Sequence, residues 1–244
     1  MIRVLVIQND PLAPSGHFGY SLVEAGAELT TLHVYQEEER VEINVQDYQG
    51  LVVLGGRINA FDEEQQPLTN YVIQTIQAFH HQQKPTFGIC LGAQFLAKAL
   101  KTGFRSNNGW EVGFTELSKT LAGSQDTVFS TINEQCRLFE MHEDSFFLPE
   151  NSELLMSGRE CTNQAFKVDD YHYGVQFHPE ATSEIVKNWV EYIRSKPNDQ
   201  GQDMAKQMLT MQPEDFQKQK ETCQKLAVNW LALVKAQSLL CASS

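Results

Sequence analysis

The stretch Phe87–Gln94 reads Phe-Gly-Ile-Cys-Leu-Gly-Ala-Gln and lies at the end of an apolar run. We predict a strand over Pro85–Ile89 that passes directly into a helix from Leu91 to about Lys101. Glycine on both sides of the cysteine suits so tight a turn, because a side chain there would meet neighbouring backbone. The turn would project the sulfur of Cys90 at the carboxyl end of the sheet, where open α/β folds bind ligands.

The predicted helix also bears on the chemistry of this cysteine. Its N-terminal N–H groups and dipole favour the thiolate, which is the nucleophilic form. The backbone N–H of Leu91, directly after Cys90, is placed to donate to an oxyanion. A free cysteine is often just a small buried apolar residue. The flanking glycines and a suitable base downstream favour a nucleophile instead.

That base stands in Phe-His-Pro-Glu, residues 177–180, which closes a second apolar strand. Parallel strands open on the same edge, so His178 could take the thiol proton and later protonate a leaving amine. Glu180, two residues on, could hold the imidazole in the required tautomer. We favour structural roles for five other histidines: His17, His33, His80, His81 and His172.

On both sides of the cysteine turn, apolar strands alternate with amphipathic helices along the chain. The predicted strands are Ile2–Ile7, Glu28–Val34, Gly50–Leu54, Pro85–Ile89 and Tyr173–Phe177, and the other predicted helices include Tyr20–Ala25, Thr69–His80 and one that carries Ile185, Trp189 and Ile193. This alternation predicts an α/β fold, with an open, mostly parallel sheet and helices on both faces. Short alternating segments between Gly103 and Asp170 predict a small antiparallel β excursion.

The composition changes at Ser195, after which Gln, Lys, Asp and Glu dominate up to residue 224. A last amphipathic helix is expected to carry Leu226, Trp230, Leu233 and Val234. We therefore predict one α/β domain over residues 1–194 and a helical extension, 195–244, packed on it. The extension could be a solvated surface helix or a contact with a partner, including a second copy in a homodimer.

The 244 residues carry a net charge of -12, with 31 acidic and 19 basic side chains. This balance argues against nucleic acid and anionic membranes as partners. The five scattered cysteines include no Cys-x-x-Cys pair, so we expect neither a disulfide framework nor a structural zinc. Nucleotide-binding glycine motifs are absent and no cofactor or metal is expected. Without a signal peptide or a membrane span in the sequence, we expect a cytoplasmic protein.

Taken together, Gly-Ile-Cys-Leu-Gly-Ala-Gln and Gln-Phe-His-Pro-Glu resemble the class I (triad-type) glutamine amidotransferases. The resemblance covers roughly residues 1–194 and is greatest to stand-alone relatives of the amidotransferase domain of GMP synthetase. Further segments fit that family: Leu54-Gly55-Gly56 with Asp62-Glu63, Glu111-Val112-Gly113, Met141-His142-Glu143-Asp144 and Asn163-Gln164-Ala165-Phe166.

The resemblance implies a catalytic role for each motif position. Cys90 would attack the side-chain carboxamide of glutamine, release ammonia and form a γ-glutamyl thioester. His178 and Glu180 would complete the triad. The backbone N–H groups of Gly56 and Leu91 would stabilise the oxyanion.

Other matched positions would bind the substrate. The resemblance assigns Gln94, one helical turn after the nucleophile, and Gly55 to substrate binding. Asp144 could face the α-amino group of the substrate or be an ordinary turn residue. Two positions depart from the family pattern, since Arg57 replaces a proline and Glu143 replaces a glycine.

Four functions remain open from the sequence. The chain could be an amidotransferase subunit that delivers ammonia to a separate synthetase, or a self-sufficient γ-glutamyl hydrolase or peptidase. Both use the same thioester chemistry. A non-catalytic regulatory module is disfavoured by the intact Cys90, His178 and Glu180. The redox or chaperone branch of cysteine-elbow proteins typically has histidine where this chain has Leu91.

Overall fold

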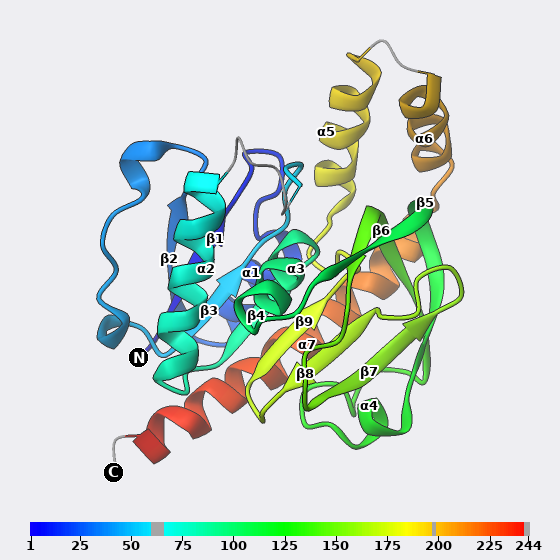
Figure 1. The fold of residues 1–244 in the computed structure, drawn as a ribbon. Coiled ribbons are helices and arrows are strands. Elements are labelled where there is room, and N and C mark those ends of the chain that lie inside the picture. The colour runs from blue at the N-terminus through cyan, green and yellow to red at the C-terminus, as the bar shows by residue number, and fades with distance from the viewer. Residues whose placement is uncertain (60–65, 197–198, 242–244) are drawn as a thin grey trace.

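The computed structural model describes residues 1–59, 66–196 and 199–241. A single nine-stranded sheet runs through these residues in the order β2-β1-β3-β4-β9-β8-β7-β5-β6 (Figure 1). The strands are β1 (Ile2–Gln8), β2 (Ala27–His33), β3 (Gly50–Val53), β4 (Thr86–Ile89), β5 (Phe104–Lys119), β6 (Gln135–Phe146), β7 (Ser152–Gly158), β8 (Ala165–Val168) and β9 (His172–Val175). The first five in the order pair in parallel, and β9, β8, β7, β5 and β6 pair antiparallel.

The helices are α1 (Gly16–Glu24), α2 (Gln66–His81), α3 (Leu91–Ala99), α4 (Leu121–Gln125), α5 (Ser183–Arg194), α6 (Asp199–Leu209) and α7 (Pro213–Cys241). Four of them, α1, α2, α3 and α7, cover the two faces of the parallel half. On one face of the sheet, side chains of α2 and α3 pack against β1 and β3. On the other face, side chains of α1 and α7 pack against the same strands. Strand residues such as Val4, Val6 and Val52 are fully buried, as expected for strands covered on both sides. The predicted α/β fold with a mostly parallel sheet and additional antiparallel strands is confirmed.

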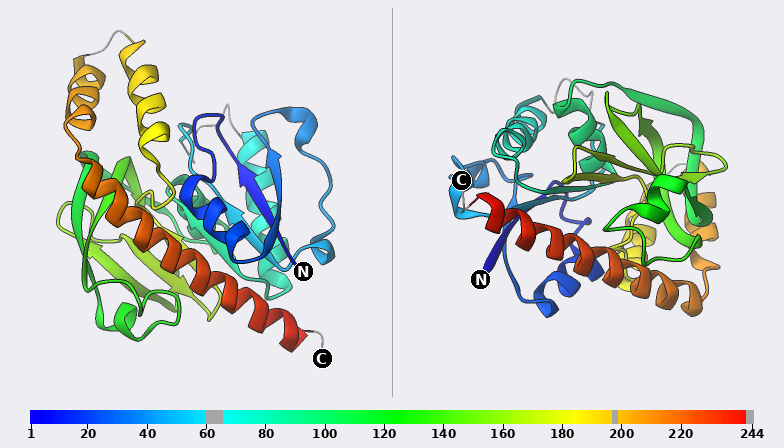
Figure 2. Two further views of the ribbon diagram at one scale, coloured as in Figure 1. Left: turned by 180° about the vertical axis from the view of Figure 1, so that it is seen from behind. Right: turned by 90° about the horizontal axis from the view of Figure 1, so that it is seen from below.

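Helix α7 lies along one face of the sheet, and helix α6 packs beside α5 (Figure 2). Trp230 of α7 is fully buried, and its ring packs with those of Phe18 and Phe87 at centroid distances of 6.2 and 6.0 Å. Helix α6 joins β5 through Gln207, whose Nε2 donates to the carbonyl of Val112 at 2.7 Å. The division of the chain at residue 195 stays a prediction.

Strand β6 and helices α4 and α6 were not predicted from the sequence. Strand β6 carries charged residues at alternate positions, a pattern that suggests an exposed face, yet Glu140 and His142 are buried. Helix α6 is polar, and only Gly201, Ala205 and Met208 on it are buried. None of the helices in the described ranges is long and apolar enough to cross a membrane.

Candidate active site

Cys90 lies on a strained turn between β4 and α3, with φ 50° and ψ -109°. A Cβ on Gly88 would lie 2.6 Å from the carbonyl oxygen of Gly92, and one on Gly92 would collide with the carbonyl of Val53. The Cys90 N–H donates to the carbonyl of Val175 at 2.7 Å, which ties the turn to β9. The close backbone approach therefore requires both glycines of the motif and fixes the sulfur at the carboxyl end of β4.

His178 and Glu180 lie beside this turn, in the segment after β9. His178 Nδ1 is 2.7 Å from Glu180 Oε1, and both side chains are buried. Burial opposes protonation of the imidazole, but Glu180 and the hydrogen-bonded Cys90 sulfur outweigh it and raise the pKa of His178 well above its usual value. The structure thus brings the three predicted catalytic side chains together.

Neighbouring segments hold the histidine and the glutamate in place. The His178 N–H donates to the carbonyl of Phe139 at 2.8 Å, and the Glu180 carbonyl accepts from the N–H of His17 at 2.9 Å. The ring of Trp189, on α5, meets the imidazole edge-on at 5.0 Å, and its indole N–H donates to the carbonyl of Leu12 at 2.6 Å. The orientation of the imidazole is therefore set by the sheet and α5 together.

The loop after β3 faces the cysteine from the other side. Gly56 and Leu91 line one pocket with Cys90, as their predicted oxyanion role requires. The Nε of Arg57 lies 2.6 Å from Asp10 Oδ2, so the residue that replaces the family's proline anchors the loop to the end of β1. The donor roles of Gly56 and Leu91 stay predictions.

The pocket above Cys90 has a volume of about 450 Å³. Its lining beyond the catalytic groups comes from the loops, from β5 and β6 and from the C-terminal helices: among others Arg57, Trp110, Asp144, Tyr192, Lys196 and Met204. The guanidinium of Arg57 lies 4.2 Å from the centre of the Tyr192 ring, and the ammonium of Lys196 lies 4.9 Å from it. The wall formed by α5 therefore combines aromatic surface with positive charge.

Two of the predicted substrate-binding residues line the pocket, and the third packs against the catalytic histidine. Gln94 and Asp144 both line the pocket. Gln94 Nε2 donates to the backbone carbonyl of Asp144 at 3.1 Å, and the Asp144 carboxylate accepts from Asn59 at 3.1 Å. A Cβ on Gly55 would lie 3.1 Å from Cε1 of His178, so the glycine packs against the imidazole. These binding roles stay predictions, and Asp62-Glu63 lies outside the described residues.

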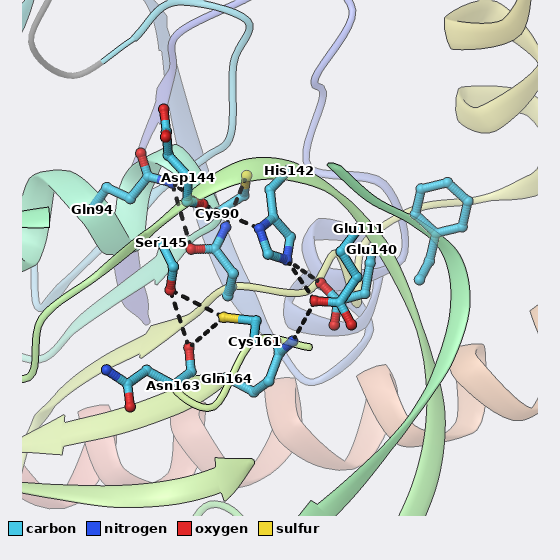
Figure 3. Close-up of polar contacts among 12 residues, drawn as sticks. Cys90, Gln94, Glu111, Glu140, His142, Asp144, Ser145, Cys161, Asn163 and Gln164 are labelled. Carbon is cyan, nitrogen blue, oxygen red and sulfur yellow. Dashed lines mark hydrogen bonds and ion pairs between the residues drawn. The ribbon is translucent and has the colours of Figure 1, made fainter. Parts of the chain in front are cut away.

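A buried charged cluster lies next to the pocket (Figure 3). His142 Nε2 is 3.2 Å from Glu111 Oε2 and 3.0 Å from Glu140 Oε2, and all three side chains are buried. Burial raises the pKa of Glu140 to about 7, although His142 acts in the opposite direction. Burial also opposes protonation of His142, but the two carboxylates outweigh it and raise its pKa to about 10. Glu111 and His142 both lie in segments that resemble the family, but these segments do not reveal that their two strands pair.

Gln176 was also missed as a site residue, although it belongs to the quoted Gln-Phe-His-Pro-Glu motif. Its side chain is fully buried, and its Nε2 donates to the Cys90 sulfur at 3.5 Å. Its Oε1 accepts from Gln94 Nε2 at 3.5 Å. The quoted motif could have suggested its proximity, since Gln176 lies two residues before His178 at the end of a strand that neighbours β4.

Two groups of side chains in the described ranges have ligand atoms near enough to share a metal ion: Glu111, His142 and Cys161, and His80, Asp169 and His172. In the first group, the Glu111 carboxylate pairs with the imidazole of His142, and the Cys161 thiol donates to Ser145 Oγ at 3.2 Å. In the second group, His80 Nδ1 and His172 Nε2 lie 2.9 Å apart and hydrogen-bond to each other. The expectation that no metal is bound stays a prediction.

Comparisons with known proteins identify the family of this chain. The sequence model of the family described as glutamine amidotransferase class-I matches residues 16–190. The chain is 29% identical over 163 residues to a glutamine-hydrolyzing GMP synthase subunit of Sulfurisphaera tokodaii, covering 63% of this chain and 81% of that protein. It is 26% identical over 181 residues to gamma-glutamyl peptidase 3 of Arabidopsis thaliana, covering 70% of each.

A solved structure of a glutamine amidotransferase is similar over nearly the whole chain. The crystal structure of a glutamine amidotransferase from Thermotoga maritima superposes with a TM-score of 0.81 at 26% identity, covering 96% of this chain and 97% of that one. The family match spans more than half of the chain and contains the cysteine turn and the His-x-Glu segment. The chain belongs to the class-I glutamine amidotransferase family.

Proposed function

We propose that the protein hydrolyses a γ-glutamyl amide through a thioester on Cys90, with His178 and Glu180 as its catalytic partners. The observation that carries this proposal is the buried His178–Glu180 pair, 2.7 Å apart, whose His178 lines the same pocket as Cys90. A buried carboxylate on one side of an imidazole and a thiol on the other form the arrangement of a nucleophile, its base and the orienting group.

The first half-reaction forms the thioester. The Cys90 sulfur attacks the carbonyl carbon of the γ-amide, and the carbonyl oxygen takes up the negative charge. N–H groups of Gly56 and Leu91 would stabilise that oxyanion. His178 then donates its proton to the amide nitrogen as the carbon–nitrogen bond breaks, and ammonia or an amine leaves.

The second half-reaction releases glutamate. Water attacks the thioester carbonyl and gives a proton to His178, and the carbon–sulfur bond breaks. The Cys90 sulfur leaves as a thiolate, which the protonated imidazole stabilises. Glu180 keeps Nδ1 of the imidazole hydrogen-bonded, so Nε2 is directed to the reacting atoms in both steps.

A second candidate, a γ-glutamyl peptidase, is supported by the size of the pocket. Glutamine has about ten non-hydrogen atoms. If each takes about 30 Å³, the share of one molecule in liquid water, glutamine would fill about 300 Å³. The pocket holds about 450 Å³, and Trp110, Tyr192 and Met204 lie along it. The extra space and its apolar lining suit a leaving amine larger than ammonia, and the relative from Arabidopsis is named a gamma-glutamyl peptidase.

A separate synthetase that receives the ammonia remains part of the proposal for the first candidate. The relative from Sulfurisphaera tokodaii is named as one subunit of GMP synthase, and the residues it matches cover most of its own length. A partner of this kind would stimulate glutamine hydrolysis. It would have no effect on the hydrolysis of γ-glutamyl peptides by a self-sufficient enzyme.

The deciding experiment is a substrate panel. Purified protein is incubated with glutamine, γ-glutamyl dipeptides and γ-glutamyl aryl amides, and released glutamate is measured. We expect hydrolysis of at least one compound, and preference for a bulky leaving amine would favour the peptidase.

Cys90→Ala should reduce hydrolysis to background. Cys136→Ala is the matched control, because Cys136 is also buried but lies outside the pocket. Absence of hydrolysis of every compound, together with no covalent adduct on Cys90 from a glutamine-like electrophile, would contradict the catalytic proposal.

A further inference from the structure

Besides His178, the side chain of Gln176 also contacts the Cys90 sulfur. It follows β9 directly, is fully buried and does not line the pocket, so it touches the sulfur from inside the protein. Its backbone N–H donates to the carbonyl of Gln164 at 2.8 Å, which fixes the start of the side chain. A buried amide of this kind is retained only where its polar atoms have partners.

The orientation of the Gln176 amide follows from its neighbours. The backbone carbonyl of Asp144 can only accept, so the group of Gln94 that faces it at 3.1 Å must be the NH₂. The second N–H of that group points to Gln176, 3.5 Å away, which must present its oxygen there. The NH₂ of Gln176 is then left to face the Cys90 sulfur at 3.5 Å.

The far end of this chain of contacts is His142. Its Nδ1 lies 3.1 Å from the same Asp144 carbonyl, and a carbonyl needs a donor. Its Nε2 faces the carboxylates of Glu111 and Glu140, where a proton is again required for attraction. Both ring nitrogens therefore carry protons, in agreement with the pKa of about 10 for His142. The imidazolium and Gln94 share one acceptor, and each holds the Asp144 carbonyl in place for the other.

We propose that Gln176 is a catalytic hydrogen-bond donor to the sulfur of Cys90, and that Gln94 and the protonated His142 are positioning residues that orient it. The donor stabilises the thiolate before attack and again when the sulfur leaves the thioester. The proposal rests on the proposed function only in taking Cys90 as the nucleophile. It gives the buried charges of β5 and β6 a role in the chemistry at β4.

The test measures the sulfur directly and needs no substrate. The rate at which iodoacetamide, a neutral reagent, alkylates Cys90 is measured across the neutral pH range, with the site identified by peptide mass mapping. In Gln176→Met, which keeps a similar volume but has no donor, alkylation at neutral pH should slow about tenfold. In Gln94→Met, where Gln176 keeps its donor but loses the contact that orients it, we expect about a threefold slowing.

Gln219→Met is the matched control, because Gln219 is also a fully buried glutamine with two hydrogen bonds, to Phe139 and Ala181, and is not in contact with the sulfur. Circular dichroism and thermal melting establish which variants fold, and Gln94→Met carries the test if Gln176→Met does not. Unchanged alkylation in the folded variants, or equal slowing in the control, would overturn the proposal. If no γ-glutamyl compound is hydrolysed but alkylation slows as expected, the proposed function fails, while the inference that Gln176 donates to the Cys90 sulfur stands.

Discussion

The two halves of the sheet supply different kinds of groups to one site. The parallel half provides Cys90 at the end of β4 and Gly56 after β3, and places His178 beyond β9. The antiparallel half provides buried charges, with Glu111 on β5 directly opposite His142 on β6. Reacting groups thus come from strand ends, where the topology gathers them, while supporting charges come from the middle of paired strands.

Because of this difference, substitutions in the two halves of the sheet should have different kinds of effect. A group at a strand end depends on backbone geometry, so a change there should act on catalysis or on folding as a whole. A charge buried between paired strands depends on its proton and its partner, so a change there should appear as a dependence on pH. Single substitutions in each half can separate these two kinds of effect.

The largest effect is expected at Glu180. Glu180→Gln keeps the size of the side chain but removes the carboxylate that lies 2.7 Å from His178 Nδ1. Loss of an orienting carboxylate lowers turnover by about 10⁴-fold in comparable triads, because the imidazole adopts the wrong tautomer and its charge is no longer balanced. Steady-state hydrolysis of the best substrate in the panel measures this, and Glu184→Gln, on the nearby helix α5, is the control. A loss of less than about tenfold would exclude Glu180 from the triad.

The next effect is on stability and belongs to the parallel half. Gly92→Ala would place a methyl group against the carbonyl of Val53, with backbone on both sides of the contact. We expect a loss of about 4 kcal/mol in the free energy of unfolding, since neither strand nor helix can move alone. Urea denaturation measures it. Gly103→Ala, where the nearest atom to the new methyl is 3.6 Å away on Phe147, should change stability by less than about 1 kcal/mol.

The contrast between the halves also explains what could be predicted from the sequence. The cysteine turn is local: apolar strand, glycine, cysteine, glycine and helix follow one another within a few residues, and the sterics of the turn allow few other interpretations. His178 could be matched to it because parallel strands open on one edge. The pairing of Glu111 with His142 depends on the register of two long strands, which slips between Ser106 and Glu111.

Other parts were hidden for related physical reasons. Strand β6 has charges at alternate positions, as an exposed strand has, and only the assembled structure shows that Glu140 and His142 pair with each other inside the protein. The role of α6 in lining the pocket, through Gly201 and Met204, could not be read from a polar helix whose position depends on the contact of Gln207 with β5. The amphipathic last helix was visible, because its buried side chains, Trp230 among them, recur at helical spacing.

Glu140 tests the antiparallel half. The pKa of its carboxyl is raised from 4.5 to about 7, so the folded state binds this proton more tightly than the unfolded state does. Stability from this group is fully present below pH 4.5 and is lost as the pH rises to about 7. Glu140→Gln has no carboxyl group to deprotonate and does not suffer this loss. The free energy of unfolding of the variant, relative to that of the wild type, should therefore rise by about 3 kcal/mol from pH 4.5 to about pH 7.

Urea denaturation of both proteins at a series of pH values measures the change. Glu116→Gln alters the net charge equally but removes an exposed carboxylate on β5, and its stability relative to the wild type should follow no such trend. A Glu140→Gln curve parallel to that of the wild type would mean that the carboxyl is not held protonated by its burial, and the contrast between the two halves would lose its electrostatic part.

The smallest effect is expected at Arg57, where a charge supports the parallel half from the solvent side. Its ion pair with Asp10 is short, 2.6 Å, but the arginine side chain is 44% exposed. The arginine end of the pair is open to solvent, and the buried Asp10 carboxylate keeps the N–H of Leu12 as a donor at 2.8 Å. We therefore expect the pair to contribute about 1 kcal/mol, so Arg57→Ala should lower kcat/KM about fivefold by loosening the loop that carries Gly56. Salt screens such a pair, so high NaCl should shrink the difference between variant and wild type. Arg159→Ala, a change at a 94% exposed arginine away from the pocket, should leave kcat/KM unaltered. A difference that persists at high salt would show that Arg57 supports the loop by packing on Tyr192, 4.2 Å away, and not by its charge on Asp10.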